Sequence, residues 1–207
     1  MAAGVGRIVV SSSGAAYGYH ADNPSWLIEE DPVRGNDSFA YSRHKRLVEE
    51  MLAEFRETNP ELEQVVLRIG TILGETVDNQ ITDLFKAKRL LKIKGSDSPF
   101  VFIWDQDVVA IIEQAVLGDV TGIFNVAGDG RMKIGEIAEA MGREPQVQET
   151  RARPGAIAQG ALHREGACET LRRLLVAPSV HRHDPPVVLE PSPLLLVLVS
   201  ARREQRR

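Results

Sequence analysis

The chain has 207 residues, a formal net charge of −4 and 43% hydrophobic residues, which suits one domain with a sizeable core. Its one cysteine, Cys168, cannot form an internal disulfide, and the first ten residues show no basic segment followed by a long apolar run, so nothing indicates secretion. The apolar run Leu194–Val199 is far shorter than the roughly 20 residues of a membrane helix. We therefore expect a cytoplasmic protein that does not enter a membrane.

Composition divides the chain near residue 150. Residues 1–150 carry 15 Lys and Arg against 24 Asp and Glu, whereas residues 151–207 carry ten Arg, no Lys and five acidic residues. The second segment also has no aromatic residue and holds six of the eleven prolines. Such a segment cannot readily build a core, so we predict a domain over 1–150 and a disordered tail over 151–207. The acidic domain argues against nucleic acid as a partner, despite the basic tail.

The first elements are a buried strand over 7–11, a small-residue loop over 12–18, and a long amphipathic helix over 38–57. Asp37 or Ser38 is expected to cap this helix, and Asn59-Pro60 to end it. A second apolar strand over 64–69 ends at Gly70 and Gly74. The remaining expected elements are a helix over 80–90, a strand over 100–103, a helix over 107–116, a strand over 123–126 and a helix over 133–141.

Strands that alternate with helices predict an α/β fold with a parallel sheet and helices on both faces. Open sheets of this kind bind ligands at the carboxyl ends of their strands. The segments 11–13 and 70–74 both follow predicted strands, so we expect the functional site there.

Tyr41 and Lys45 lie four residues apart on the long predicted helix, which places both side chains on one face. A free tyrosine has a pKa of about 10 and is a poor base at neutral pH. A lysine ammonium one turn away favours the phenolate, and Ser13 can donate a hydrogen bond to the same substrate oxygen. The alternative is a chance spacing, in which the tyrosine ring packs and the lysine is solvated.

Five sequence blocks occur in order: 11–18 (SSSGAAYG), 41–45 (YSRHK), 67–74 (LRIGTILG), 102–107 (FIWDQD) and 122–127 (GIFNVA). Together they resemble the extended short-chain dehydrogenases/reductases, the NAD-dependent epimerase/dehydratase family, over about residues 5–143. The resemblance implies a partial Rossmann-type sheet, a small part of a substrate subdomain, and NAD or NADP as cofactor, with NAD favoured.

The resemblance also implies a role for each matching residue. Ser13, Tyr41 and Lys45 would be catalytic, with Tyr41 as the acid/base and Lys45 also binding the nicotinamide ribose. Ser13 would contact the substrate as well. The other implied contacts are Ser11, Ser12, Ile69 and Gly70 with the cofactor and Thr71 with the substrate, while Asp107 would fix a helix start.

Three departures from the family pattern stand out. The sequence contains no Gly-x-x-Gly-x-x-Gly turn to bind a pyrophosphate, so we expect a chain truncated at its amino terminus that binds NAD weakly or not at all. Phe100 stands where sugar-nucleotide enzymes carry an arginine, and Thr71 where many carry asparagine. The resemblance also stops near Glu144, so we expect an altered carboxyl terminus.

Two functions remain open. The first is NAD(P)-dependent oxidoreductase or epimerase chemistry on a secondary alcohol or ketone, sugar-derived molecules included. The second is a catalytically inactive family fragment that acts as a binding or regulatory protein. We expect a small-molecule substrate, a homodimer through the Tyr41/Lys45 helix, and no metal site, because the tail residues Cys168, His163, His181 and His183 fit no common zinc spacing.

Overall fold

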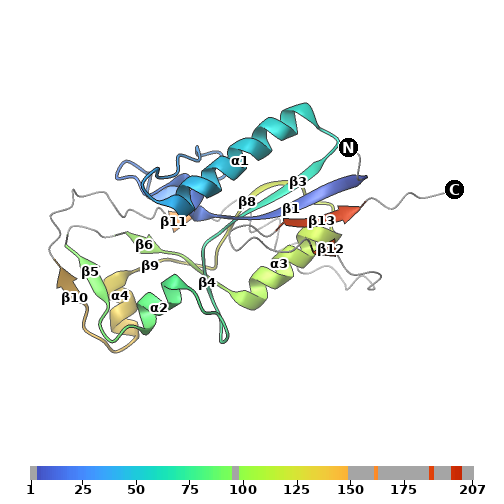
Figure 1. Cartoon of the computed structure of the whole chain (residues 1–207). Helices are drawn as coiled ribbons and strands as arrows, with labels where there is room; N and C mark the ends of the chain where they lie inside the picture. The colour runs from blue at the N-terminus through green and yellow to red at the C-terminus, as the bar shows by residue number, and fades with distance from the viewer. Residues whose placement is uncertain (1–3, 95–97, 149–160, 163–186, 189–196, 202–207) are drawn as a thin grey trace.

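The computed structural model describes residues 4–94, 98–148, 161–162, 187–188 and 197–201. Its largest sheet has five strands in the order β12–β13–β1–β3–β8. These are β12 (Val187–Val188), β13 (Val197–Ala201), β1 (Val5–Ser13), β3 (Glu63–Ile69) and β8 (Gly122–Val126). Strands β1, β3 and β8 are parallel. Figure 1 shows α1 (Ala40–Thr58) on one face of these strands and α3 (Asp105–Leu117) on the other, so the predicted α/β fold is confirmed.

The face of the sheet toward α3 is apolar. Alternate residues of β3, such as Val65, Leu67 and Ile69, point to one side of the sheet and pack in one cluster with Val108 and Ile111 of α3. These five side chains are between 1% and 8% exposed. Central strands of a parallel sheet are buried on both faces, which accounts for the continuous apolar run that predicted β3.

The face toward α1 is different, because a row of polar residues crosses it. Ser12 of β1 stands opposite Arg68 of β3, and Arg68 stands opposite Asn125 of β8. All three residues are buried, at 3%, 3% and 6% exposure. Buried polar groups require hydrogen-bond partners, so this row determines what can pack above it.

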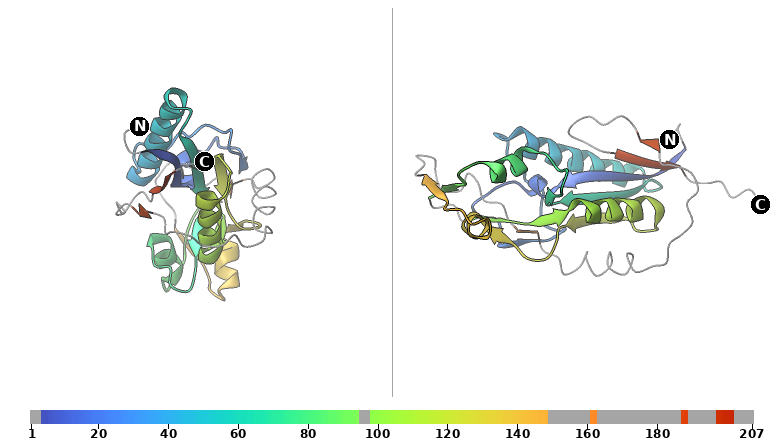
Figure 2. Two further views of the ribbon diagram at one scale, coloured as in Figure 1. Left: turned by 90° about the vertical axis from the view of Figure 1, so that its right-hand side faces the viewer. Right: turned by 90° about the horizontal axis from the view of Figure 1, so that it is seen from below.

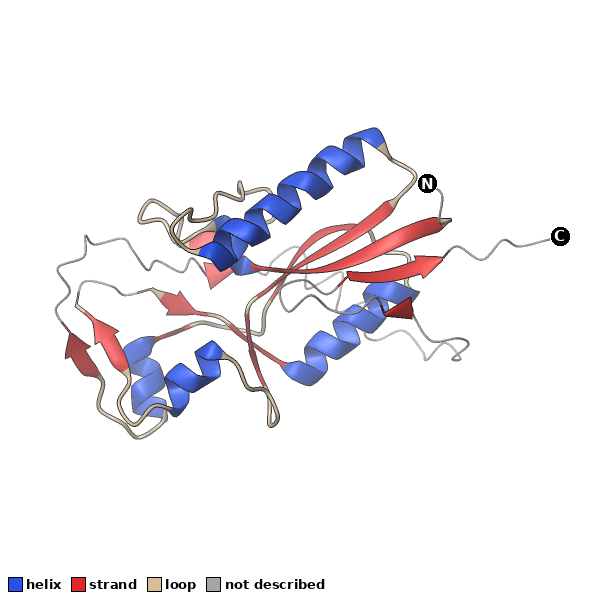
Figure 3. Ribbon diagram, in the orientation of Figure 1, coloured by secondary structure: helices blue, strands red, loops and turns tan. Residues whose placement is uncertain are grey.

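Short elements form a second lobe beside the sheet (Figures 2 and 3). They are α2 (Gln80–Lys86), β5 (Leu91–Ile93), β6 (Pro99–Phe100), β9 (Met132–Lys133), α4 (Ile134–Ala140) and β10 (Gln146–Gln148). The Phe85 ring lies 5.5 Å from that of Phe100 and 5.8 Å from that of Phe102. Phe100 therefore contributes to a hydrophobic cluster.

Several element boundaries differ from the sequence-based expectation. The predicted cap of α1 by Asp37 or Ser38 is wrong: Phe39 occupies the N-cap without a side-chain hydrogen bond, and the Asp37 carboxylate instead pairs with Arg46 at 3.0 Å. The expected strand over 100–103 is divided between β6, which pairs with β9, and β7 (Phe102–Trp104), which pairs with β4 (Thr71–Leu73). Helix α2 ends at Lys86, before the expected boundary at residue 90.

Most of the predicted tail, 151–207, lies outside the described residues, as do Cys168, His163, His181 and His183. Of this segment the structure describes β12, β13 and β11 (Ala161–Leu162), and β11 pairs with β2 (Trp26–Leu27). Strand β13 runs antiparallel beside β1. Among the described helices, none has the length and hydropathy required to cross a bilayer.

Replacing Leu67 by alanine should lower the free energy of unfolding by about 2–5 kcal/mol, because the side chain is 1% exposed and its removal leaves a cavity. Leu117→Ala on α3 is the matched control, since that leucine is 65% exposed, and should change stability by no more than about 0.5 kcal/mol. Urea unfolding measures both. Equal losses in the two variants would contradict the assignment of this core.

Candidate active site

The carboxyl ends of β1 and β3 lie side by side. Ser13 is the last residue of β1 and stands opposite Ile69, the last residue of β3. Beyond it, the Gly70 amide donates to the Val126 carbonyl at 2.9 Å. A Cβ at Gly70 would lie 3.0 Å from a methyl carbon of Val101, so the chain passes too closely here for a side chain to fit comfortably. Thr71 follows as the first residue of β4, half-buried.

Ser13 begins the short 3-10 helix η1 (Gly14–Tyr17) as its N-cap. Its Oγ accepts a hydrogen bond from the Ala15 amide at 3.2 Å. The hydroxyl hydrogen is not used by this contact, because a serine can accept and donate at once. The capping bond therefore orients the Ser13 side chain and leaves it able to donate to a ligand.

Tyr41 and Lys45 occupy the first two turns of α1. Tyr41 is 37% exposed, whereas Lys45 is only 6% exposed. The Lys45 Nζ lies 5.6 Å from the centre of the Tyr41 ring and donates to the Ser11 carbonyl at 2.7 Å. The lysine is therefore buried and the tyrosine is the more exposed of the two, which is the reverse of the packed tyrosine and solvated lysine expected for a chance spacing.

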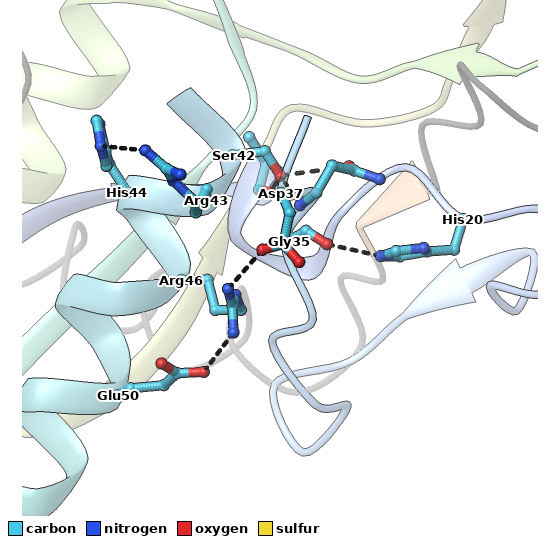
Figure 4. A network of polar contacts seen from close by, with 10 residues as sticks. His20, Gly35, Asp37, Ser42, Arg43, His44, Arg46 and Glu50 are labelled. Atoms are coloured by element: carbon cyan, nitrogen blue, oxygen red, sulfur yellow. Dashed lines mark hydrogen bonds and ion pairs between the residues drawn. The ribbon is translucent and has the colours of Figure 1, made fainter. Parts of the chain in front are cut away.

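Ser42, the residue after Tyr41, ties α1 to η1. It is fully buried, and its hydroxyl donates to the Ala15 carbonyl at 2.6 Å while accepting from the Asn36 amide at 3.0 Å. Figure 4 shows Ser42 near Asp37, Arg46 and Glu50. The Asp37–Arg46 ion pair ties the preceding loop to the same helix, and Arg46 also pairs with Glu50 within it. One hydroxyl thus fixes the start of α1 to the segment that carries Ser13.

Glu49 and Arg68 form a buried ion pair beneath α1. The Arg68 Nε and Nη2 both donate to Glu49 Oε2, at 2.9 and 2.7 Å, and each side chain is 4% exposed. Ser12 donates to the other carboxylate oxygen, so its hydroxyl is engaged with Glu49 in this structure. Arg68 also donates to the Tyr17 hydroxyl at 2.7 Å.

Burial shapes the acidity of the groups around this site. Desolvation raises the pKa of Tyr17 to about 12, against the opposing effect of Arg68. Desolvation, with a smaller contribution from Tyr41, raises the pKa of Tyr19 to about 12 as well. Burial lowers the pKa of Lys45, while the nearby Glu49 carboxylate acts in the opposite direction. Two of the three tyrosines are therefore held neutral, and Tyr41 is the exposed one.

Sequence reasoning missed Glu49, Arg68 and Ser42. A signal for two of them was present, since Arg68 interrupts an otherwise apolar strand and Glu49 lies one helical turn beyond Lys45. A charge in a buried strand requires a partner of opposite charge. Ser42 gave no comparable signal, because a serine next to an exposed tyrosine is commonplace.

Comparison with known proteins places the chain in a family. The sequence model described as "NAD dependent epimerase/dehydratase family" matches residues 1–127, more than half of the chain. The chain belongs to this family. Among the proteins it resembles, a UDP-glucose 4-epimerase of Erwinia amylovora is 34% identical over 79 residues, which are 38% of this chain and 23% of that protein. An uncharacterized protein of Mycobacterium tuberculosis is 22% identical over 141 residues, 68% of this chain.

Solved structures of other proteins share the fold. The UDP-glucose 4-epimerase of Thermus thermophilus, in complex with NAD, matches with a TM-score of 0.59 and 21% identity, over 81% of this chain and 57% of its own. MoeE5, in complex with UDP-glucose and NAD, matches with a TM-score of 0.64 and 24% identity, over 83% and 60%. This chain spans 38% of the mycobacterial relative and less than two thirds of either solved chain.

The tyrosine environments predict a simple alkaline titration. Because burial raises the pKa of both Tyr17 and Tyr19 to about 12, the phenolate absorbance of these two residues should appear only near that pH. Tyr19→Phe should lower the amplitude of the absorbance step near pH 12, because one of the two buried phenols is removed. Tyr17 and Tyr19 would ionise near pH 10 in the unfolded chain, so their contribution to stability is complete below pH 10 and is lost as the pH rises to about 12.

Near-ultraviolet difference spectra of the folded chain measure the titration, and circular dichroism at each pH verifies that the fold persists. A step near pH 12 with the same amplitude in Tyr19→Phe would contradict the assignment of Tyr19 as a buried phenol.

Proposed function

We propose that this chain carries the proton-transfer part of an NAD-dependent oxidoreductase or epimerase site that acts on a secondary alcohol or ketone. The observation that supports this most directly is the buried Lys45 ammonium beneath the half-exposed Tyr41 ring. A buried lysine without a carboxylate bonded directly to it is costly in a purely structural role. The Lys45 ammonium lies near the carboxyl end of the sheet, bonded to the Ser11 carbonyl. This end of the sheet is where α/β folds bind ligands.

In the proposed reaction, oxidation of the alcohol breaks one C–H and one O–H bond. The hydroxyl proton passes to the Tyr41 phenolate as the hydride leaves carbon, and the reverse direction returns both. The Lys45 ammonium stabilises the phenolate. Ser13 donates a hydrogen bond to the substrate oxygen and orients it, and Thr71 contacts the substrate further along the same edge.

The residues present fit the nicotinamide half of NAD. Lys45 uses one of its three N–H groups on Ser11 and keeps two for ribose hydroxyls. Ile69 and Gly70 end β3 with a close-packed backbone that a flat ring can approach, and Ser11 lies beside them, whereas the Ser12 hydroxyl serves Glu49. The nicotinamide, when bound, would accept or supply the hydride. NAD is favoured over NADP because the similar solved structures were crystallised with NAD.

The substrate proposal stays with small molecules that carry a secondary hydroxyl, sugar-derived ones included. MoeE5 was solved with UDP-glucose, which supports a sugar. Phe100, however, packs against Phe85 and supplies no charge for a diphosphate. The alternative is that the chain is catalytically inactive and binds a ligand or partner. A measurement of turnover distinguishes this alternative from the enzymatic function.

At NAD concentrations high enough to offset the weak binding expected without a glycine-rich turn, Tyr41→Phe should lower NAD-dependent turnover of a panel of secondary alcohols by roughly 10²-fold or more, because the ring stays in place and only the proton carrier is lost. Ser13→Ala should lower it less, since an orienting hydrogen bond is lost and the proton carrier remains. Reduced-cofactor absorbance measures the rate, and Tyr19→Phe is the matched control. Near-normal turnover in a folded Tyr41→Phe chain would rule out the assignment. No turnover in the wild-type chain would favour the binding alternative.

The outer side of α1 supports a homodimer as a further part of the proposal. Leu47, Met51 and Phe55 repeat every four residues and are 41%, 69% and 40% exposed. Apolar residues with this spacing form one stripe along a helix. A second copy of the same helix would cover the stripe on both partners at once, as a two-fold symmetric interface requires.

Met51→Glu should shift the chain toward monomer, because the change puts a charge at the centre of the stripe on both partners. Sedimentation equilibrium over a concentration series measures the shift. Val109→Glu is the matched control: Val109 is 64% exposed on α3, on the opposite face of the sheet, and should leave the association unchanged. A wild-type chain that is monomeric at all concentrations would overturn the dimer proposal.

A further inference from the structure

The side of α1 that faces the sheet is polar. Its buried residues are Ser42, Lys45 and Glu49, at 0%, 6% and 5% exposure. Burying a charge costs several kcal/mol unless partners compensate it. An amphipathic helix would normally bury its apolar side. The charged residues that α1 buries instead therefore need an explanation other than packing.

Glu49 has a full set of partners. Its two carboxylate oxygens receive hydrogen bonds from Ser12 and, twice, from Arg68. Arg68 is fixed in turn by Tyr17, whose ring centre lies 4.6 Å from the guanidinium carbon, and by the Glu29 carbonyl at 2.9 Å. The position of the carboxylate under α1 is therefore set by strand β3 and η1 as well as by its own helix.

Among the residues that the structure describes, no carboxylate is hydrogen-bonded to Lys45 in this way. Its ammonium donates to the Ser11 carbonyl. The titratable groups around Lys45 belong to three elements. Tyr41 and Glu49 lie on α1, and Arg68 on β3 pairs with Glu49. Tyr17 in η1 accepts a hydrogen bond from Arg68. Burial lowers the pKa of Lys45, and Glu49 is the group that raises it. Glu49, one helical turn away, is thus the carboxylate placed to keep the ammonium charged.

We propose that Glu49 is a positioning residue that acts through Lys45: its carboxylate, held by Arg68 and Ser12 one helical turn along the same buried face, holds the ammonium at the Ser11 carbonyl and beside the Tyr41 ring. Only the last step, in which Tyr41 carries the substrate proton, rests on the proposed function. Loss of the Glu49 carboxylate would have two effects on Lys45. The ammonium would lose a nearby negative charge, and the neighbouring Arg68 charge would no longer be compensated.

The test is a pair of titrations of the chain without NAD or substrate. The Lys45 side-chain nitrogen is followed by NMR, assigned with Lys45→Arg, and the Tyr41 phenolate by near-ultraviolet absorbance. In Glu49→Gln, Lys45 should lose its proton at a lower pH than in the wild type, and Tyr41 should ionise at a higher pH. Glu50→Gln is the matched control, because Glu50 is an exposed neighbour paired with Arg46, and it should move neither titration.

A second variant separates charge from packing. Arg68→Gln leaves the Glu49 charge in place without its partner, so Lys45 should lose its proton at a higher pH, opposite to the effect of Glu49→Gln. If Glu49 had only a structural role, both variants would move the pH at which Lys45 loses its proton in the same direction. That result would overturn the proposal. If Glu49→Gln does not fold, Glu49→Asp withdraws the carboxylate by one methylene and should move Lys45 in the same direction by less; an unmoved Lys45 overturns the proposal.

The two titrations also test the steps separately. A shift of Lys45 without a shift of Tyr41 would overturn the link between Glu49 and the phenol. Both readouts are independent of turnover, so an inactive chain or a dispensable Tyr41 would refute the proposed function without deciding this test.

Discussion

The buried pair Glu49–Arg68 joins three parts of the molecule at one point. Arg68 lies in the central strand β3, Glu49 in α1, and the Tyr17 hydroxyl brings in the segment that follows Ser13. Two charges at 4% exposure are expensive to desolvate, and only close geometry with full hydrogen bonding compensates them. This requirement fixes the height and rotation of α1 over the sheet, and with them the places of Tyr41 and Lys45.

The two faces of the sheet illustrate different uses of burial. The α3 side is a conventional apolar core around Val65, Leu67 and Ile69, where packing supplies stability. The α1 side replaces much of that core by a polar row, which specifies one arrangement because each group must meet its partner. The candidate site lies at the end of the polar face, where an imprecise helix would misplace Tyr41 and Lys45.

The order of the main strands and helices could be predicted from the sequence, because apolar runs and helical periodicity survive in the fold. Residues such as Tyr41 and Lys45 could be placed on one helical face from their spacing. The direction of that face could not be predicted: the apolar stripe of α1 suggests an inward side, yet Leu47 and Met51 face outward while Lys45 and Glu49 face the sheet. Which side a helix buries depends on what the sheet offers, and here the sheet offers Ser12 and Arg68.

The small elements were harder to predict for a related reason. Phe100 and Phe102 are separated by a single residue, yet β6 pairs with β9 and β7 pairs with β4. The Val101 carbonyl between them accepts from the Thr71 amide, on the β4 side. Helix capping at Asp37 failed because Arg46 offered its carboxylate a better partner. In both cases a distant residue in the sequence decided a local structure.

Strand β13 has a consequence for how the sheet can grow. It lies antiparallel along β1, with Val9 opposite Leu198 and Val10 opposite Val197, and so uses the backbone donors and acceptors on that side of β1. Unpaired strand edges invite aggregation, and β13 shields this one. Any other strand can join the sheet beside β1 only by exchange, displacing β13 bond by bond. On this side of β1, the sheet can therefore either keep β13 or pair with another strand, but not both.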